Sequence, residues 1–83
     1  MQVRGRLDAA EADQALATLN SIPGPLTLDC SDLEYISSAG ISVIMQTLKR
    51  LTGHGSRLTL IELKPRVRNV FVYAGLDKVL DIR

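Results

Sequence analysis

The chain has 83 residues, and its ten basic and nine acidic side chains give a net charge of +1. This length allows one hydrophobic core, so we expect a single domain over residues 1–83 and exclude a two-domain enzyme. Hydrophobic residues make up 46% of the chain and charged residues 23%, a balance typical of folded globular proteins and too apolar for disorder. The near-neutral charge argues against direct nucleic-acid binding, because phosphate contacts need a strong positive field.

The sequence shows no signal for export or membrane insertion. Its N-terminal residues lack an apolar signal core, and the longest apolar stretch, residues 41–45, is far shorter than the roughly 20 residues of a membrane helix. Cys30 is the only cysteine, so neither an internal disulfide nor a CxxC pair can form. These features predict a cytoplasmic protein without membrane insertion.

Strand-like and helix-like segments alternate along the first half of the chain. We predict a short strand over residues 3–7 and a helix over residues 9–20, which Asp8 can cap. A Pro-Gly-Pro segment ends this helix. Period-two alternation then predicts a strand over residues 26–30, followed by a turn at residues 31–32.

The second half repeats the alternation. From Ala39 the apolar period is that of a helix, which a Gly-His-Gly turn ends. A buried strand over residues 57–62, a helix from Pro65 to Ala74 and a last strand over residues 78–82 follow. The apolar faces predicted for the two helices comprise Ile41, Ile44, Met45, Leu48 and Leu51 in the first, and Val67, Val70, Phe71 and Ala74 in the second.

This order of elements predicts an α/β fold. Strands joined through helices need right-handed crossovers, so we expect a small, mostly parallel four-stranded sheet with about three helices. Three helices are few for the two faces of a sheet. We therefore expect that an edge strand is lacking, or that a partner or a second copy in a homodimer supplies cover.

Polar side chains follow three of the predicted strands. Asp8 follows the first strand, residues 29–39 follow the second, and residues 64–66 follow the third. Because parallel sheets hold their functional loops at the carboxyl ends of the strands, we expect these groups to converge at one edge. The acidic and hydroxyl side chains of the middle segment are Asp29, Asp32, Glu34, Ser37 and Ser38.

The segment Ser37-Ser38-Ala39-Gly40 opens the middle helix. Its simplest interpretation is a serine N-cap, which contributes about 1 kcal/mol. Two features favour a further role. The small residues Ala39 and Gly40 leave the helix start open to another protein, and a phosphate placed there would be stabilised by the helix dipole and the free N–H groups.

The other candidate residues form no catalytic set. His54, the only histidine, lies in a predicted turn, and Cys30 faces the core of a predicted strand. The carboxylates within residues 29–34 could form a metal cluster, but they match no Ca²⁺ loop pattern and are more simply solvated. Arg66 and Arg68 are interpreted as a solvated face, with phosphate sensing as the alternative. We expect no metal and no cofactor.

Residues 28–41, LDCSDLEYISSAGI, resemble the STAS domain of bacterial anti-sigma factor antagonists. The shared pattern is an apolar strand ending in Asp, a short loop, an aromatic or apolar pair, and a Ser-rich turn with Gly that opens a helix. Gly5-Arg6-Leu7-Asp8 resembles the family's Gly-x-Leu-Asp segment, and residues 64–76 resemble its third helix and the following turn. The likeness covers essentially the whole chain, without the family's usual extra N-terminal strand and C-terminal helix.

The resemblance implies a regulatory binding protein, not an enzyme. In this family an anti-sigma factor serine kinase binds the unphosphorylated antagonist and phosphorylates a serine at the start of the middle helix, and a PP2C-type phosphatase reverses the modification. Aligned through Gly40, the family's Asp-Ser-Ser/Thr-Gly motif places the acceptor at Ser38, with Ser37 in the Asp position and less favoured as acceptor. The expected surroundings of the acceptor and partner-binding residues are Asp8, Asp32, Ser37, Gly40 and Ile41.

Two other functions stay open. A STAS-like subunit of a transporter or signalling complex would need the same fold and docking face but no reactive serine. A small hydrolase that uses Ser38 as nucleophile would need a base at the same edge, and the sequence offers none there.

Overall fold

A computed structural model describes residues 1–83 and contains one parallel four-stranded sheet in the order β1-β2-β3-β4. The predicted α/β fold is confirmed. Its strands are β1 (Gln2–Leu7), β2 (Leu26–Ile36), β3 (Leu58–Ile61) and β4 (Asp81–Ile82). Its helices are α1 (Ala9–Asn20), α2 (Ser38–Gly53), α3 (Pro65–Tyr73) and the short 3₁₀ helix η1 (Leu76–Lys78).

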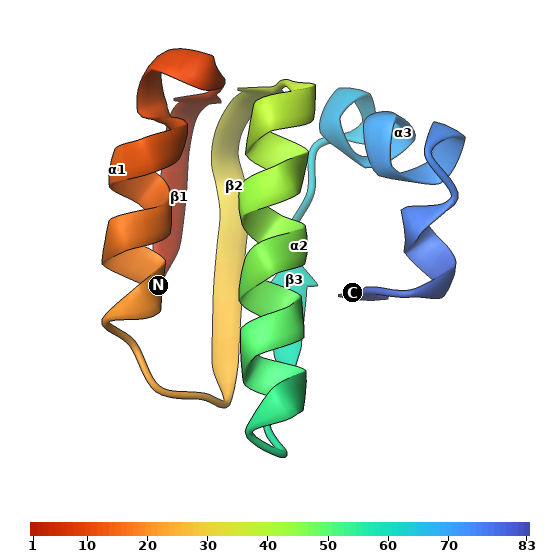
Figure 1. Ribbon diagram of the computed structural model, residues 1–83. Helices are drawn as coiled ribbons and strands as arrows, with labels where there is room; N and C mark the ends of the chain where they lie inside the picture. Colours follow the sequence, from red (N-terminus) through yellow and green to blue (C-terminus); the bar gives the residue numbers. More distant parts are fainter.

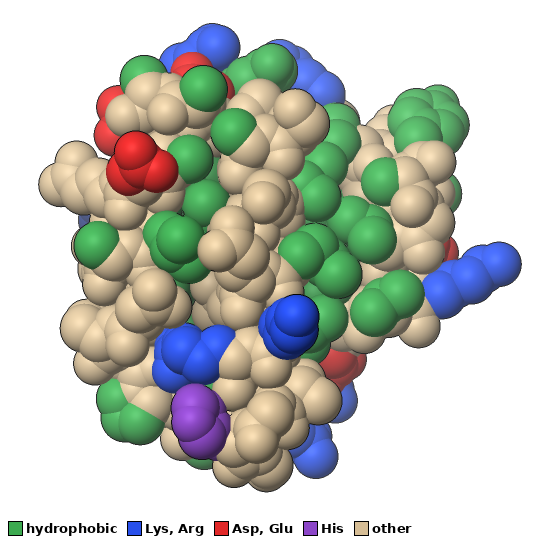
Figure 2. Space-filling model, viewed as in Figure 1, with side chains coloured by type: hydrophobic (Ala, Val, Ile, Leu, Met, Phe, Trp, Pro, Cys, Tyr) green, Lys and Arg blue, Asp and Glu red, His purple; other side chains and the backbone are tan.

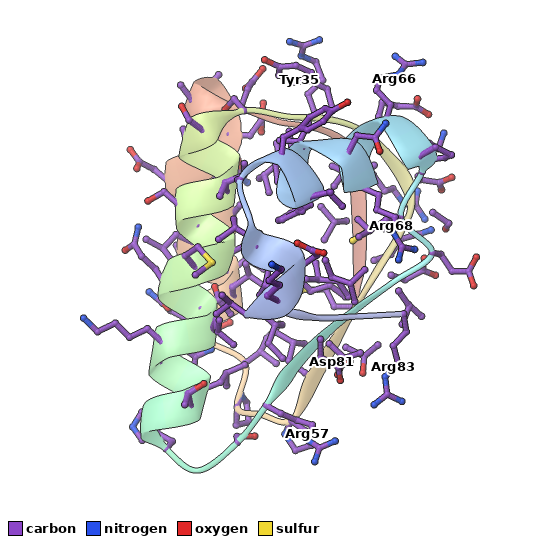
Figure 3. The ribbon with its side chains drawn as sticks, turned by 90° about the vertical axis from the view of Figure 1, so that its right-hand side faces the viewer. Tyr35, Arg57, Arg66, Arg68, Asp81 and Arg83 are labelled. Atoms are coloured by element: carbon purple, nitrogen blue, oxygen red, sulfur yellow. The ribbon has the colours of Figure 1, made fainter.

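The helices lie on one face of the sheet. α1 and α2 run side by side in front of β1 and β2, and α3 crosses near the carboxyl ends of the strands on the β3 side (Figure 1). Viewed from the β4 edge, the opposite face of the sheet carries no helix (Figure 3). A single core of 15 buried apolar residues lies between the sheet and the helices, with Phe71 and Leu28 fully buried in it.

β2 is longer than predicted, and the predicted turn at Ser31–Asp32 is wrong. The strand continues for 11 residues to Ile36. Its buried side chains are two residues apart up to Cys30 and three residues apart afterwards. In the sequence, this break in the period-two pattern looks like the end of a strand and the start of a turn. In the structure, two register shifts in the pairing of β1 with β2 accommodate this change. Gly5, with φ +67°, lies at one of the shifts.

The C-terminal part also differs from the prediction. Residues 76–78 form η1, and only Asp81–Ile82 pair with β3, so the last strand is shorter than the predicted strand. α3 buries Val67 and Phe71 as predicted, but Ala74 is exposed because it lies at the C-cap, beyond the last turn.

The buried side of α2 is rotated relative to the predicted stripe. The helix packs mainly against α1 and also contacts β2 and β3; Val43 and Thr47 are buried, whereas Met45 and Leu48 are only partly buried. The full buried set of α2 is Gly40, Val43, Ile44, Thr47 and Leu51.

Arg50 connects α2 to the end of α1. Its Nη2 donates hydrogen bonds to the carbonyl oxygens of Leu19, at 2.8 Å, and Ile22, at 2.9 Å. Leu19 belongs to the last turn of α1, where carbonyl groups lack helical partners and a cation is favoured by the helix dipole. Arg50, in the last turn of α2, therefore links this helix to the end of α1.

We expect Arg50→Met to lower the free energy of unfolding by about 2 kcal/mol, because it keeps an apolar stem and removes two charge-assisted hydrogen bonds. Urea unfolding followed by circular dichroism measures the change. Lys49→Met is the control, since Lys49 is exposed and makes no such bond; its effect should stay within about 0.5 kcal/mol. Equal losses in both variants would contradict the role of Arg50.

Candidate functional site

The carboxyl ends of β1 and β2 bring Asp8 and the serine pair to the same edge of the sheet. Leu7 pairs in register with Ile36, and the backbone N–H of Ser37 donates to the carbonyl oxygen of Leu7 at 3.0 Å. α1 and α2 begin directly after these residues, so their N-termini open side by side at the top of the molecule (Figure 1).

Ser37 and Ser38 have different environments. Ser37 is the N-cap of α2: it is half-buried, and its Oγ accepts a hydrogen bond from the N–H of Gly40 at 3.4 Å. Ser38 is the first residue of the helix, is exposed, and makes no side-chain hydrogen bond within the protein. Capping therefore occupies Ser37 and leaves the hydroxyl of Ser38 free at the surface.

Gly40 allows α2 to start close to β1. A Cβ atom at this position would lie 2.2 Å from the carbonyl oxygen of Leu7 and 2.8 Å from Cγ1 of Ile36. Both distances are far below van der Waals contact, and the first neighbour is a backbone atom that cannot move aside. Gly40 is buried, so it positions the serine pair from beneath and is not itself a contact surface for a partner.

We expect Gly40→Ala to destabilise the protein by about 2–3 kcal/mol, because the added methyl group must push α2 away from β1. Gly53→Ala is the matched control: it lies in the same helix, a Cβ there meets nothing within 4 Å, and alanine favours the helix by up to about 1 kcal/mol. Thermal unfolding of the two variants measures the contrast. Comparable effects of the two substitutions would rule out the steric argument.

Asp8 caps α1, as the sequence predicts. Its Oδ1 accepts a hydrogen bond from the N–H of Ala10 at 3.2 Å, and its Oδ2 pairs with Nε of Arg6 at 3.1 Å. The hydrogen bond from Arg6 is the main cause that lowers the pKa of Asp8 below its ordinary value. The carboxylate therefore stays ionised beside the serine pair, with Arg6 as its counter-charge.

Arg6 has a second contact that the sequence did not reveal. Its guanidinium carbon lies 4.4 Å from the centre of the Tyr35 ring, a distance typical of a cation–π interaction. Arg6 and Tyr35 are register partners in β1 and β2, so they lie on the same face of the sheet. Only the pairing of the two strands brings them together.

We expect the protein to become less stable as the pH is lowered in the acidic range, because the carboxylate of Asp8 then becomes protonated. Because its pKa is lower in the folded state, the stabilisation by Asp8 is present above its ordinary pKa of 3.8 and is lost as pH falls through the folded-state value. Asp8→Asn keeps the capping oxygen and removes the charge, so unfolding midpoints measured from about pH 5 to about pH 2 should change less than in the unsubstituted protein. A pH dependence of the unfolding midpoint that Asp8→Asn does not flatten would contradict this account.

Asp32 and Glu34 do not lie in a loop at this edge, so their predicted position is wrong. Both belong to β2, because the strand continues past the predicted turn. Asp32 pairs in register with Arg4 and accepts a hydrogen bond from Nε2 of Gln2 at 3.1 Å. It lies four residues before the end of the strand, about 13 Å from Ile36, and so outside the surroundings of Ser38.

Glu34 pairs with Lys64 at the start of α3, and this contact lowers the pKa of the Glu34 carboxyl. Arg66 adds to the same effect from the first turn of α3. Figure 3 shows Arg66 at the upper edge together with Tyr35, whereas Arg68 lies lower on the molecule. No group of three or more His, Cys, Asp or Glu side chains is placed to hold a metal ion.

The remaining candidates lie away from the serine pair. His54 is the C-cap of α2, about 24 Å along the helix from Ser38, so the two cannot form a nucleophile and base pair. Cys30 is buried in β2, and burial raises the pKa of its thiol to about 11, which leaves it unreactive. Ile41, in the first turn of α2, is half-buried against the core. None of the helices combines the length and apolar character that crossing a membrane requires.

This fold is that of a STAS domain. The family described as Mlab, STAS domain, matches residues 1–81 of the chain. The chain is also 34% identical over 84 residues to the anti-sigma factor antagonist BtrV of Bordetella bronchiseptica, across 96% of this chain and 72% of that protein. The chain therefore belongs to the anti-sigma factor antagonists of the STAS domain family.

Solved structures agree with this assignment. An anti-sigma factor antagonist from Thermotoga maritima superimposes with a TM-score of 0.88 at 25% identity, over 95% of this chain and 72% of that chain. Two others share the fold at 17% identity: a sulfate transporter family protein of Wolinella succinogenes (TM-score 0.82, 96% of this chain and 68% of that chain) and the unphosphorylated anti-sigma factor antagonist SpoIIAA (TM-score 0.72, 99% and 74%). The antagonist relatives are regulatory proteins, and this agrees with the expectation of a binding protein rather than an enzyme.

Proposed function

We propose that the protein binds an anti-sigma factor kinase while Ser38 is unphosphorylated and is released when this kinase phosphorylates Ser38. The exposed, unbonded hydroxyl of Ser38 at the first position of α2 carries the proposal. A kinase can reach this oxygen without unfolding the helix, because Ser37 and not Ser38 makes the N-cap. A PP2C-type phosphatase would restore the binding form, and such a cycle would operate in the cytoplasm.

A phosphate on Ser38 is compatible with the fold. It would lie at a helix N-terminus, where free N–H groups and the helix dipole stabilise an anion. The folded domain therefore need not change when the serine is modified. The effect of phosphorylation falls on the surface that a partner contacts.

The added charge would weaken partner binding. A phosphoserine carries about −1.5 to −2 charges at neutral pH. The nearby carboxylate of Asp8 is already paired with Arg6, so the phosphate would be a new negative group beside it. A partner that fits the neutral hydroxyl must desolvate or oppose this charge, and we expect a loss of a few kcal/mol, or about 100-fold in affinity.

Phosphorylation by the cognate kinase with ATP, followed by mass spectrometry of the modified peptide, tests the acceptor. We expect one phosphate on Ser38 in the unsubstituted protein and in Ser37→Ala, and none in Ser38→Ala. The Ser37→Ala control removes the N-cap and keeps the acceptor, at a cost of about 1 kcal/mol in stability. Phosphate incorporation that persists unchanged in Ser38→Ala would refute the assignment.

The same experiment continues with binding to the anti-sigma factor by calorimetry. Ser38→Asp should weaken binding by at least about 30-fold. Asn has nearly the same shape as Asp but no charge, so the affinity of Ser38→Asn should stay within about threefold of that of the unsubstituted protein. The alternative function, a STAS subunit of a transporter or signalling complex, needs no phosphorylation. Equal binding by the Asp and Asn variants would favour this alternative and contradict a charge-operated release.

A further inference from the structure

A groove of about 740 Å³ runs along the outer side of α2, and Val79, the residue after η1, closes its other side. Met45, Leu48 and Val79 form its apolar lining, and Val79 is 58% exposed. Figure 2 shows apolar side chains gathered in one patch between α2 and the α3–η1 region. We propose that this groove binds an amphipathic helix of a partner protein, with acidic residues beside the apolar side of that helix.

The shape of the groove fits a helix. Its lining residues on α2 extend from Ser42 to Gly53, which corresponds to about 16 Å, or three helical turns. Met45, Leu48 and Thr52 recur along one side of α2 at spacings of three and four residues, so the groove follows the helix axis. Amphipathic helices commonly bind in elongated apolar grooves of this kind, and their side chains enter the groove at the same spacing of three and four residues.

The charged residues at the groove favour a partner helix with acidic side chains. α2 contains no Asp or Glu, and no acidic residue lines the groove. The charged group in the lining is Lys49, and an adjoining hollow is formed by Gln46, Lys49, Arg50, Gly53 and His54, again without a carboxylate. Acidic residues on the partner would therefore meet a cation at the rim and no opposing negative charge on α2.

The same charges argue against a second copy of this chain as the occupant. A twofold dimer through the groove would place α2 of one protomer against α2 of the other, with Lys49 facing Lys49. Neither helix could supply the acidic groups that this arrangement needs. An acidic helix from another protein meets both the apolar and the charge requirement.

This groove is distinct from the proposed acceptor, Ser38. Met45 and Leu48 lie about 10 and 15 Å along α2 from Ser38, and Ser38 does not line the groove. The inferred contact does not depend on the state of Ser38. A partner helix held in the groove could therefore stay bound while the N-terminal edge of α2 is phosphorylated.

Two synthetic peptides of about 16 residues test the inference by NMR titration of the isotope-labelled protein at physiological salt. One peptide has leucines at helical spacing flanked by glutamates, and the other has lysines in place of the glutamates. We expect the acidic peptide to shift the amide signals of residues 42–53 and of Val79, and the basic peptide to bind at least about tenfold more weakly. In Lys49→Glu, we expect the acidic peptide to bind more weakly and the basic peptide more tightly than in the unsubstituted protein.

Two variants locate the contact. Val79→Ser removes an exposed apolar group of the groove and should lower the affinity for the acidic peptide by at least about threefold. Val72→Ser is the matched control, since Val72 is 42% exposed and does not line the groove, and it should leave the affinity unchanged. Ser38→Asp should also leave it unchanged, which separates this test from that of the proposed function.

Three outcomes would overturn the inference: absence of binding by the acidic peptide, equal affinity for the two peptides, or signal shifts confined to other surfaces. Sedimentation of the free protein provides the remaining check. A dimer that Val79→Ser dissociates and Val72→Ser does not would show that the groove is filled by a second copy, contrary to the inference.

Discussion

The contact between the end of β1 and the start of α2 determines the geometry of the site. The carbonyl oxygen of Leu7 accepts the N–H of Ser37 at 3.0 Å, and the absence of a side chain at Gly40 lets the helix backbone approach the same oxygen. Asp8 follows Leu7 directly, and Ser38 follows Ser37. The two side chains are therefore held beside each other by the backbone, and the position of Ser38 does not depend on any contact of its own hydroxyl.

The serine pair separates a structural role from a proposed functional one. An Asp or a Ser can cap a helix, because both side chains offer an oxygen to the free N–H groups of the first turn. With Ser37 as the cap, the start of α2 carries no negative side chain, and the neighbouring carboxylate of Asp8 is compensated by Arg6. A phosphate on Ser38 would thus add a negative group that Arg6 does not already neutralise, and this gives a single modification an electrostatic effect on a partner.

Sequence periodicity predicted the elements better than their pairing. The bounds of α1, its cap at Asp8 and the end of α2 near Gly53 agree with the structure, since each depends on neighbouring residues of one element. The turn predicted after Cys30 failed because the phase of β2 depends on the register shifts of its partner β1. The contact of Arg6 with Tyr35 was missed for the same reason, and the displaced position of Asp32 follows from the longer strand.

The distribution of apolar surface shows where this small domain is open to partners. Parallel sheets are usually covered on both faces, yet here one face carries no helix. That face bears polar groups such as Thr27, Asp29 and Thr59, so water can cover this side of the sheet. The hydroxyl of Thr59 also donates a hydrogen bond to the carboxylate of Asp81 at 3.2 Å. The helix layer differs, because Val79, which follows the short η1, is exposed and one side of α2 is only partly covered. The incomplete part of the fold is therefore the helix layer and not the sheet, and α2 contributes to both the serine edge and the apolar groove.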